Sequence, residues 1–264
     1  MKAEVIRTYE NGKVTIQLDA TPAIANVLRR AVFDLVPTMA IEDLELTKNS
    51  SIMYDEMIGH RVGLLPLTTD LKSYNLISEC SCEGAGCSKC TLKLTLKAKG
   101  PETVHAEEIK SKDPKVKPVY PKTPITKLLK GQELEFEATA ILGRGSQHAK
   151  FCPGLAWYSY KPKITITNEK LDAATLQKYP PQVVSNGKID KKLIEEHNLV
   201  DAVDGISDAV TIEYDPTCML LSVEPWGQLI AKEILLSAID ELQSLLKKFE
   251  SAMEKPVEAQ EQKE

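Results

Sequence analysis

The chain has 264 residues, of which 33 are Lys or Arg and 38 are Asp or Glu, so its formal net charge is −5 at pH 7. This length is enough for one large or two modest domains with an apolar core. A negative whole-molecule field repels a nucleic-acid backbone, so any contact with nucleic acid must be local. No apolar run suits a membrane-spanning helix, and the start MKAEVIRTYE lacks the apolar stretch of a signal peptide, which favours a cytoplasmic protein.

The first forty residues predict a β-hairpin followed by a helix. Two β-rich stretches flank Asn11-Gly12, a dipeptide typical of two-residue hairpin loops. Thr21 is a suitable N-cap and Pro22 suits the first helical position, after which apolar residues recur at helical spacing up to Pro37. We therefore expect a helix over residues 22–36 with one apolar face.

Two amphipathic helices are expected to present more apolar surface than the chain can cover. Leu28 and Leu35 lie on the apolar face of the first helix, whereas Arg29 and Arg30 fall outside it, toward solvent or a partner. Near the C-terminus, apolar residues step by four, three, four and three, as in a coiled-coil seam: Leu235, Ile239, Leu242, Leu246 and Phe249. Doubled apolar positions widen this second stripe beyond what one neighbouring helix covers. Two such helices beside one sheet favour a surface shared with a second chain.

The region between the two predicted helices has a different sequence pattern, with short strand-like runs and polar segments. Strand-like runs occur at residues 91–100, 134–142, 157–167, 209–214 and 218–224. The lysine- and proline-rich segment 112–127 is predicted to be an extended loop with solvated lysines. Residues 168–208 are polar and helix-leaning, and the tail after Ser251 is polar and expected to be disordered. The strands and helices near the two ends of the chain are thus separated by a long region of different character. This layout predicts one domain assembled from both ends of the chain, with another domain inserted into it.

Four of the six cysteines lie within the short stretch CSCEGAGCSKC: Cys80, Cys82, Cys87 and Cys90. The glycines between the two pairs allow the backbone to fold back so that four thiolates converge on one ion. In a reducing compartment such crowding is more typical of metal ligands than of disulfides. Four sulfurs complete a tetrahedral shell and leave no open position for water. The pattern therefore predicts a structural metal site, with zinc favoured over an iron–sulfur centre.

Two other interpretations of the thiols are weighed against this one. Cys87 and Cys90 alone could form a redox dithiol, although that motif normally opens a helix and the residues after Cys90 read as a strand. Four thiols without a metal would be an oxidation liability. A thiol oxidoreductase and a free-standing zinc-ribbon nucleic-acid-binding protein are therefore the alternative functions.

Little else in the sequence suggests catalysis, and no catalytic residue is predicted. The four histidines stand far apart, and no P-loop, nucleotide-binding glycine fingerprint or metalloprotease motif occurs. The stretch GRGSQHAKFCPG (143–154) could hold an anion, although a positioned turn is the simpler interpretation. Cys152 and Cys218 are isolated in apolar surroundings and are expected to be buried structural residues.

Three stretches together resemble a known family: NVLRRAVFDLVPTMAIEDLEL (26–46), GHRVGLLPL (59–67) and GRGSQHAKFCPG (143–154). They are similar to the D subunit of archaeal DNA-directed RNA polymerase, to its eukaryotic third-subunit counterpart and, more distantly, to the amino-terminal domain of the bacterial alpha subunit. The resemblance covers nearly the whole chain, and the cysteine loop falls where eukaryotic relatives carry a zinc-binding loop.

The resemblance implies an α+β architecture assembled in pieces. A dimerisation domain with an antiparallel sheet and two amphipathic helices is expected from residues 1–38, 157–167 and 209–252, with an inserted β-rich domain at 39–156, a small ferredoxin-like subdomain at 168–208 and a disordered tail at 253–264. Some family members bind iron–sulfur clusters in the subdomain. Here it contains no cysteine, so no cluster is expected.

The family also implies a function. The chain is expected to be a non-catalytic assembly platform for transcription by DNA-directed RNA polymerase. It would pair through its two helices with a small alpha-like subunit, called L, and bind the second-largest subunit and small zinc-bearing subunits. It would meet DNA only through the complex, and no membrane.

Specific residues match the family's motifs. Arg29 and Arg30 match its LRR motif and would contact the second-largest subunit or fix the dimer. Six further residues match positions assigned to docking or loop architecture: His60, Arg61, Gly63, Pro66, His148 and Lys150.

Overall fold

The structure is a computed structural model that describes residues 2–197 and 199–254. The chain divides into two compact units. One combines two short N-terminal stretches with Tyr158–Leu221, and the other combines Arg7–Val14, Asn26–Trp157 and the stretch from Ser222 onward. Helices and antiparallel strand pairs occur together, which confirms the predicted α+β class.

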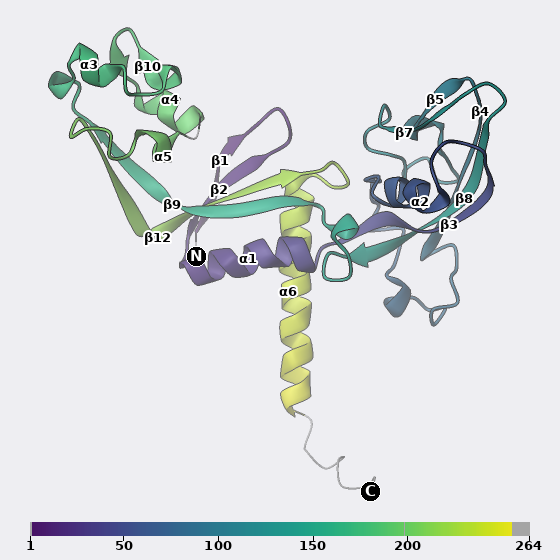
Figure 1. Ribbon diagram of the computed structural model, residues 1–264. Coiled ribbons are helices and arrows are strands. Elements are labelled where there is room, and N and C mark those ends of the chain that lie inside the picture. The colour runs from purple at the N-terminus through teal and green to yellow at the C-terminus, as the bar shows by residue number, and fades with distance from the viewer. Residues whose placement is uncertain (1, 198, 255–264) are drawn as a thin grey trace, which may run out of the picture. The chain divides into compact units, whose positions relative to one another are not determined.

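The first sheet joins strands from both ends of the sequence. Its order is β1 (Ala3–Thr8), β2 (Val14–Asp19), β12 (Val210–Pro225) and β9 (Gly154–Ile166) (Figure 1). The two predicted runs at 209–214 and 218–224 are one continuous strand, β12. Asp215, between the two runs, accepts hydrogen bonds from the amide and hydroxyl of Thr217 at 2.9 and 2.7 Å, as in a turn. Strand pairing overrides this local turn signal.

The loop between β1 and β2 is longer than predicted. The Gly12 amide donates to the Tyr9 carbonyl at 3.0 Å, and the Tyr9 amide donates to the Lys13 carbonyl at 2.9 Å. Gly12 alone has a left-handed φ, of 81°, whereas a two-residue loop of the Asn-Gly type needs left-handed backbone at both positions. The loop is therefore a three-residue turn whose glycine forms a bulge, and the predicted two-residue loop at Asn11-Gly12 is wrong.

Helices α1 (Pro22–Asp34) and α6 (Ala231–Glu254) are the two predicted amphipathic helices. In α6 the residues buried against the rest of the chain are Ala231, Ile234 and Ala238. None of the five seam residues predicted from the sequence is fully buried. The predicted tail begins too early, because α6 continues through residues 253 and 254; the rest of that tail, 255–264, lies outside the described residues.

A second sheet forms the larger apolar core. Its order is β3 (Pro37–Asn49), β8 (Glu133–Arg144), β4 (Thr91–Lys99) and β6 (Lys110–Ser111), and β5 (Glu102–His105) pairs separately with β7 (Pro124–Leu128). Buried and exposed residues alternate along β4 and β8, so one face of the sheet is apolar. On the other face lysines of β4 pair with glutamates of β8: Lys93–Glu137, Lys97–Glu135 and Lys99–Glu133, at 2.8, 2.9 and 2.7 Å.

Helix α2 (Asp55–Gly63) was not predicted from the sequence. It packs on β3 and buries Ile58 and Val62, which are one helical turn apart (Figure 1). Acidic residues occupy its first turn, and its last turn carries His60 and Arg61, which complement the helix dipole. This short helix fixes where those two candidate docking residues lie.

The lysine- and proline-rich segment is held more firmly than a solvated loop. The Thr68 amide donates to the Lys117 carbonyl at 2.9 Å, and the Val119 amide donates to the Pro66 carbonyl at 2.9 Å. Lys115 pairs with Asp70 at 2.7 Å and, by that hydrogen bond, holds the pKa of Asp70 well below its usual range. The Lys115 side chain is still 67% exposed, so it is solvated as predicted and also holds the segment to Asp70.

The segment 168–208 has a small core of its own. It contains α3 (Ala173–Leu176), α4 (Lys191–Glu196), α5 (Val200–Val203) and a hairpin of β10 (Val184–Ser185) and β11 (Lys188–Ile189). Val183, Ile194 and Val203 are fully buried in this core. Asn186 and Gly187 both have left-handed φ, of 51° and 72°, so this Asn-Gly pair does form a two-residue loop.

The stretch 143–154 is a tightly packed turn. A Cβ atom at Gly145 would overlap the carbonyl oxygen of Phe33, and one at Gly154 would overlap the carbonyl oxygen of Glu224. The Ser146 amide donates to the Asp34 carbonyl at 3.2 Å. Backbone contacts of this kind favour the positioned turn over the anion site.

Replacing Gly145 with alanine is expected to destabilise the protein by about 3 kcal/mol, because the new methyl group forces the end of α1 and the turn apart. The melting temperature should fall by roughly 6–12 °C for a domain of this size. Thermal unfolding followed by circular dichroism measures the shift, with the exposed neighbour Ser146→Ala as the control. Equal stability of the two variants would contradict this role of close packing at Gly145.

Candidate metal centre

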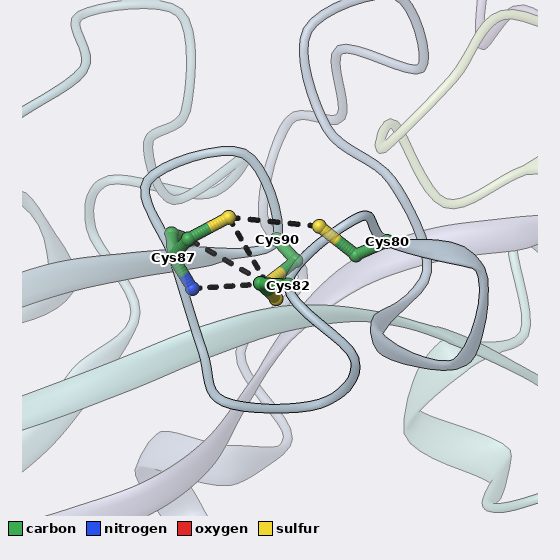
Figure 2. A group of neighbouring side chains, drawn as sticks. All are labelled: Cys80, Cys82, Cys87 and Cys90. Carbon is green, nitrogen blue, oxygen red and sulfur yellow. Dashed lines mark hydrogen bonds between the residues drawn. The ribbon is translucent and has the colours of Figure 1, made fainter.

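The four cysteines of the loop come from two tight turns ahead of β4. The first turn follows a short 3-10 helix, η1 (Ile77–Glu79), and closes when the Glu83 amide donates to the Cys80 carbonyl at 3.1 Å. In the second turn, the amides of Cys90 and Thr91 donate to the Cys87 carbonyl at 2.9 and 2.8 Å. Each turn presents two thiols toward the same point (Figure 2).

The backbone between the pairs must turn sharply. Glu83, Gly84 and Gly86 have left-handed φ values of 50°, 88° and 78°. Glycine adopts this conformation without the steric penalty that a Cβ atom imposes. The GAG turn inferred from the sequence therefore does bring the two pairs of cysteines together.

The sulfur atoms form a compact group. The Sγ atoms of Cys80 and Cys87 are 3.5 Å apart, as are those of Cys82 and Cys90, and those of Cys87 and Cys90 are 3.8 Å apart. All four sulfurs lie within 4.8 Å of one another. A zinc–sulfur bond of about 2.3 Å implies about 3.8 Å between the sulfurs of a regular tetrahedron. The donor set therefore fits one tetrahedral ion.

The thiols perturb one another's protonation. A hydrogen bond with the Cys80 side chain lowers the pKa of Cys82 to about 6, and burial raises the pKa of Cys90 to about 12. The pKa of Cys80 is raised by the Cys82 thiol and by burial, although a backbone hydrogen bond with Cys82 acts in the other direction. One thiolate thus forms easily while its neighbours resist ionisation. A bound divalent cation would stabilise the ionised form of all four thiols, so that all four could be thiolates at once.

Burial and hydrogen bonding pre-organise the site. Cys90 is fully buried at the start of β4, and its Sγ atom accepts a hydrogen bond from the Cys87 amide at 3.2 Å. Cys152 and Cys218 are also buried but lie outside the group, as the sequence predicted. Burial raises the pKa of both these isolated thiols, so each stays protonated.

An arginine ties the metal loop to the long C-terminal helix. Arg144 donates from Nη2 to Glu241 of α6 at 2.8 Å and to Glu79 at 3.4 Å. Glu79 immediately precedes the first cysteine of the group. Nothing in the sequence indicated this contact, since the three residues are far apart in the chain and carry no shared motif.

Four of the six predicted docking or loop residues line one cavity, of about 700 Å³: His60, Arg61, Pro66 and Lys150. The other two have structural positions. The Nδ1 atom of His148 accepts a hydrogen bond from the Lys150 amide at 3.1 Å, and a Cβ atom added at Gly63 would lie 3.8 Å from the Ile41 carbonyl oxygen, an ordinary contact distance. Tyr120 and Trp226 also line the cavity, and nothing in their local sequence indicated it.

The candidate interface residues on the helices are largely accessible. Leu246 and Phe249 of α6 are 66% and 65% exposed, and Leu28 of α1 is half-buried. Arg29 donates to the Asn26 side chain at 2.9 and 3.1 Å. Leu246 and Phe249 thus have little cover within the described part of the chain, whereas Leu28, Leu35, Leu235 and Leu242 are half-buried.

Arg30 makes a different contact from Arg29. It pairs with Asp34 one helical turn later at 3.6 Å and is itself well exposed. An exposed pair of this kind contributes little to stability, so the guanidinium can exchange partners readily. Among residues 2–197 and 199–254, no helix has the length and apolarity that crossing a bilayer requires.

The family comparison defines the class of protein. Residues 40–152 match the family described as "RNA polymerase Rpb3/RpoA insert domain". That range contains the second sheet apart from the first three residues of β3, together with α2 and the cysteine group. The inserted part of the chain is therefore of the RNA polymerase subunit class.

Curated relatives extend the match to most of the chain. The DNA-directed RNA polymerase subunit Rpo3 of Methanosarcina acetivorans is 34% identical over 90% of this chain and 92% of its own length. The Rpo3 subunits of Methanosphaera stadtmanae and Methanopyrus kandleri are 36% and 31% identical, over 91% and 96% of this chain and 94% and 97% of their own lengths. The chain belongs to the Rpo3 family of DNA-directed RNA polymerase subunits, which confirms the resemblance to the archaeal D subunit.

Proposed function

We propose that this RNA polymerase subunit is a non-catalytic assembly platform that pairs with the small alpha-like subunit called L. The observation that carries the proposal is the accessible apolar face of α6. Its C-terminal half presents Leu246 and Phe249 to solvent, while the chain's own core takes apolar residues nearer the start of the helix, such as Ile234 and Ala238. An uncovered apolar stripe of this width is typical of a helix that packs against a partner.

The domain roles follow from this pairing. Residues 1–38, 157–167 and 209–252 would form the dimerisation domain, and residues 39–156 would carry the metal loop. Leu28, Leu35 and the seam of α6 would be buried on pairing. Burying two helical faces in this way creates a composite surface that neither chain has alone.

The composite surface would bind the second-largest subunit and the small zinc-bearing subunits. Arg29 and the exposed Arg30 on α1 are the proposed contacts, together with His60 and Arg61 at the end of α2. His148 and Lys150 are better suited to loop architecture, because both already hold the turn 143–154 in place. The chain would meet DNA only through the complex, in the cytoplasm.

The metal loop would hold a structural zinc ion. Cys80, Cys82, Cys87 and Cys90 would each supply one thiolate, and the closed set of four leaves no position for a reacting water. Zinc would supply a cross-link between the two turns and no reaction. The 168–208 segment contains no cysteine, so we propose no cluster there.

The oxidoreductase alternative has less support. A redox dithiol needs an accessible thiolate with a lowered pKa. In the Cys87–Cys90 pair, Cys90 is fully buried and its pKa is raised to about 12. The thiol whose pKa is lowered is Cys82, which lies outside that pair.

The proposal is tested by affinity purification of the tagged chain from its native cells, followed by quantitative mass spectrometry. We expect the small alpha-like subunit and the second-largest polymerase subunit to co-purify in a fixed, equimolar ratio. Recovery of the chain alone, or with thiol reductases, would show that the platform assignment is wrong. The purified complex should also bind DNA, whereas the isolated chain, with a net charge of −5, should not.

A further inference from the structure

A cavity of about 700 Å³ lies at the end of α2. Four segments that are distant in the sequence form it: the end of α2 with the following turn, the approach to β7, the turn 143–154, and the loop after β12. Its volume is within the range of specific binding pockets, about 300–1,000 Å³. The lysine–glutamate pairs of the second sheet, the metal loop and the seam of α6 contribute no residue to its lining, so this cavity is a separate site.

The cavity has an apolar and aromatic lining. Leu64 and Tyr120 are 46% and 53% exposed, and Trp226 and Pro124 complete the apolar surface. Large side chains left this accessible in a hollow favour an apolar group of a partner, because filling the hollow removes apolar surface from water. Tyr and Trp also offer one polar donor each at such a surface.

The charged groups at the cavity have one sign. Arg61 is exposed, and Lys150 contributes a second basic group that is already paired with Glu42 and with the Ile41 carbonyl. Arg61 donates from Nη1 to the Ile125 carbonyl at 2.9 Å. That bond uses one of its five N–H groups and holds the guanidinium in place. No Asp or Glu among the described residues lines the cavity.

We propose that the cavity binds a segment of another polymerase subunit in which a bulky apolar side chain stands next to a carboxylate. The apolar side chain enters between Leu64, Tyr120 and Trp226, and the carboxylate pairs with Arg61. An arginine already oriented by a backbone carbonyl loses little side-chain entropy when it binds a carboxylate with two hydrogen bonds. This inference rests on the proposed platform function, and it states which chemical groups of a partner would be recognised at one docking site of the platform.

The test places the photo-crosslinking residue benzoylphenylalanine at Tyr120 of the tagged chain in the assembled polymerase. Mass spectrometry then identifies the crosslinked peptide. We expect one peptide from another subunit, with a large apolar residue and an Asp or Glu within about three residues of the crosslink. Leu64, replaced in the same way in a second variant, should capture the same peptide. A captured peptide without a carboxylate, or no captured peptide from either position, would overturn the proposal.

Charge reversal gives a second readout. Arg61→Glu should lower the crosslinking yield by at least about tenfold, since it opposes a carboxylate with a carboxylate. Arg61→Lys keeps the positive charge but loses the paired hydrogen bonds, so it should lower the yield less than Arg61→Glu does. Lys122→Glu makes the same charge change on an exposed residue outside the lining and should leave the yield unchanged. Equal yields from Arg61→Glu and Lys122→Glu would contradict the ion pair.

The result also separates this inference from the platform function. A polymerase that assembles with its usual subunits but gives no crosslink at Tyr120 or Leu64 overturns the cavity assignment alone. A chain that fails to co-purify with any polymerase subunit overturns both, because the occupant is then absent.

Discussion

A Cys90→Ser variant is expected to lose the metal. The serine hydroxyl cannot replace a buried thiolate, and Cys90 is the fully buried member of the group, so the affinity for zinc should fall by about a hundredfold or more. Cys82→Ser, at a more accessible position, should have the same effect with less risk to folding. Zinc content by elemental analysis, with competition by a chelating dye, measures the change. The wild-type chain should carry about one zinc ion.

The control and the structural consequence can be measured together. Cys152→Ser alters a buried thiol outside the group and should retain zinc. When the wild-type metal is removed by a chelator, hydrogen exchange should rise at residues 75–95 and stay low in the first sheet. Zinc loss from Cys152→Ser, or global unfolding on chelation, would show that the metal site has been misplaced.

The double variant Leu246→Asp, Phe249→Asp should weaken pairing with the small alpha-like subunit by more than about a hundredfold, which corresponds to roughly 2.7 kcal/mol. Both side chains are about two-thirds exposed in the single chain, so their replacement should change its own stability little. Titration of the isolated chain with the purified partner by calorimetry gives the affinity.

A matched control adds the same charge to the opposite face of the helix. Ser244 and Ser251 lie about half a turn away from Leu246 and Phe249. The double variant Ser244→Asp, Ser251→Asp should therefore bind the partner with nearly the wild-type affinity. Equal losses in both variants would indicate a general charge effect and would remove the support for this interface.

The sequence predicts the convergence of the four cysteines well because the information is local. Four ligands within eleven residues, with glycines between the pairs, leave few ways for the backbone to run. The second Asn-Gly pair, at 186–187, forms its two-residue loop in the same local manner. The first pair, at 11–12, does not, because the pairing of Tyr9 with Lys13 makes the loop one residue longer.

Features built from distant segments could not be predicted in this way. The cavity forms only where α2, the approach to β7 and the loop after β12 come together in the folded chain. No short sequence motif indicates that these segments are neighbours. The contact between Arg144 and Glu241 is of the same kind. On α6 the regular apolar spacing predicted one continuous stripe, but Ala231, Ile234 and Ala238 near its start pack against the chain's own core, whereas Leu246 and Phe249 farther along are exposed.

The strand order of the first sheet also determines when this sheet can form during synthesis on the ribosome. Strand β2 ends at Asp19, and its neighbour β12 begins at Val210. The ribosome must therefore add roughly 190 residues, over about 10 to 40 seconds, before that neighbour exists. A lone two-stranded hairpin is at best marginally stable in water, whereas the second sheet is complete once Arg144 has emerged. The first residues to be made are thus among the last to reach their native state.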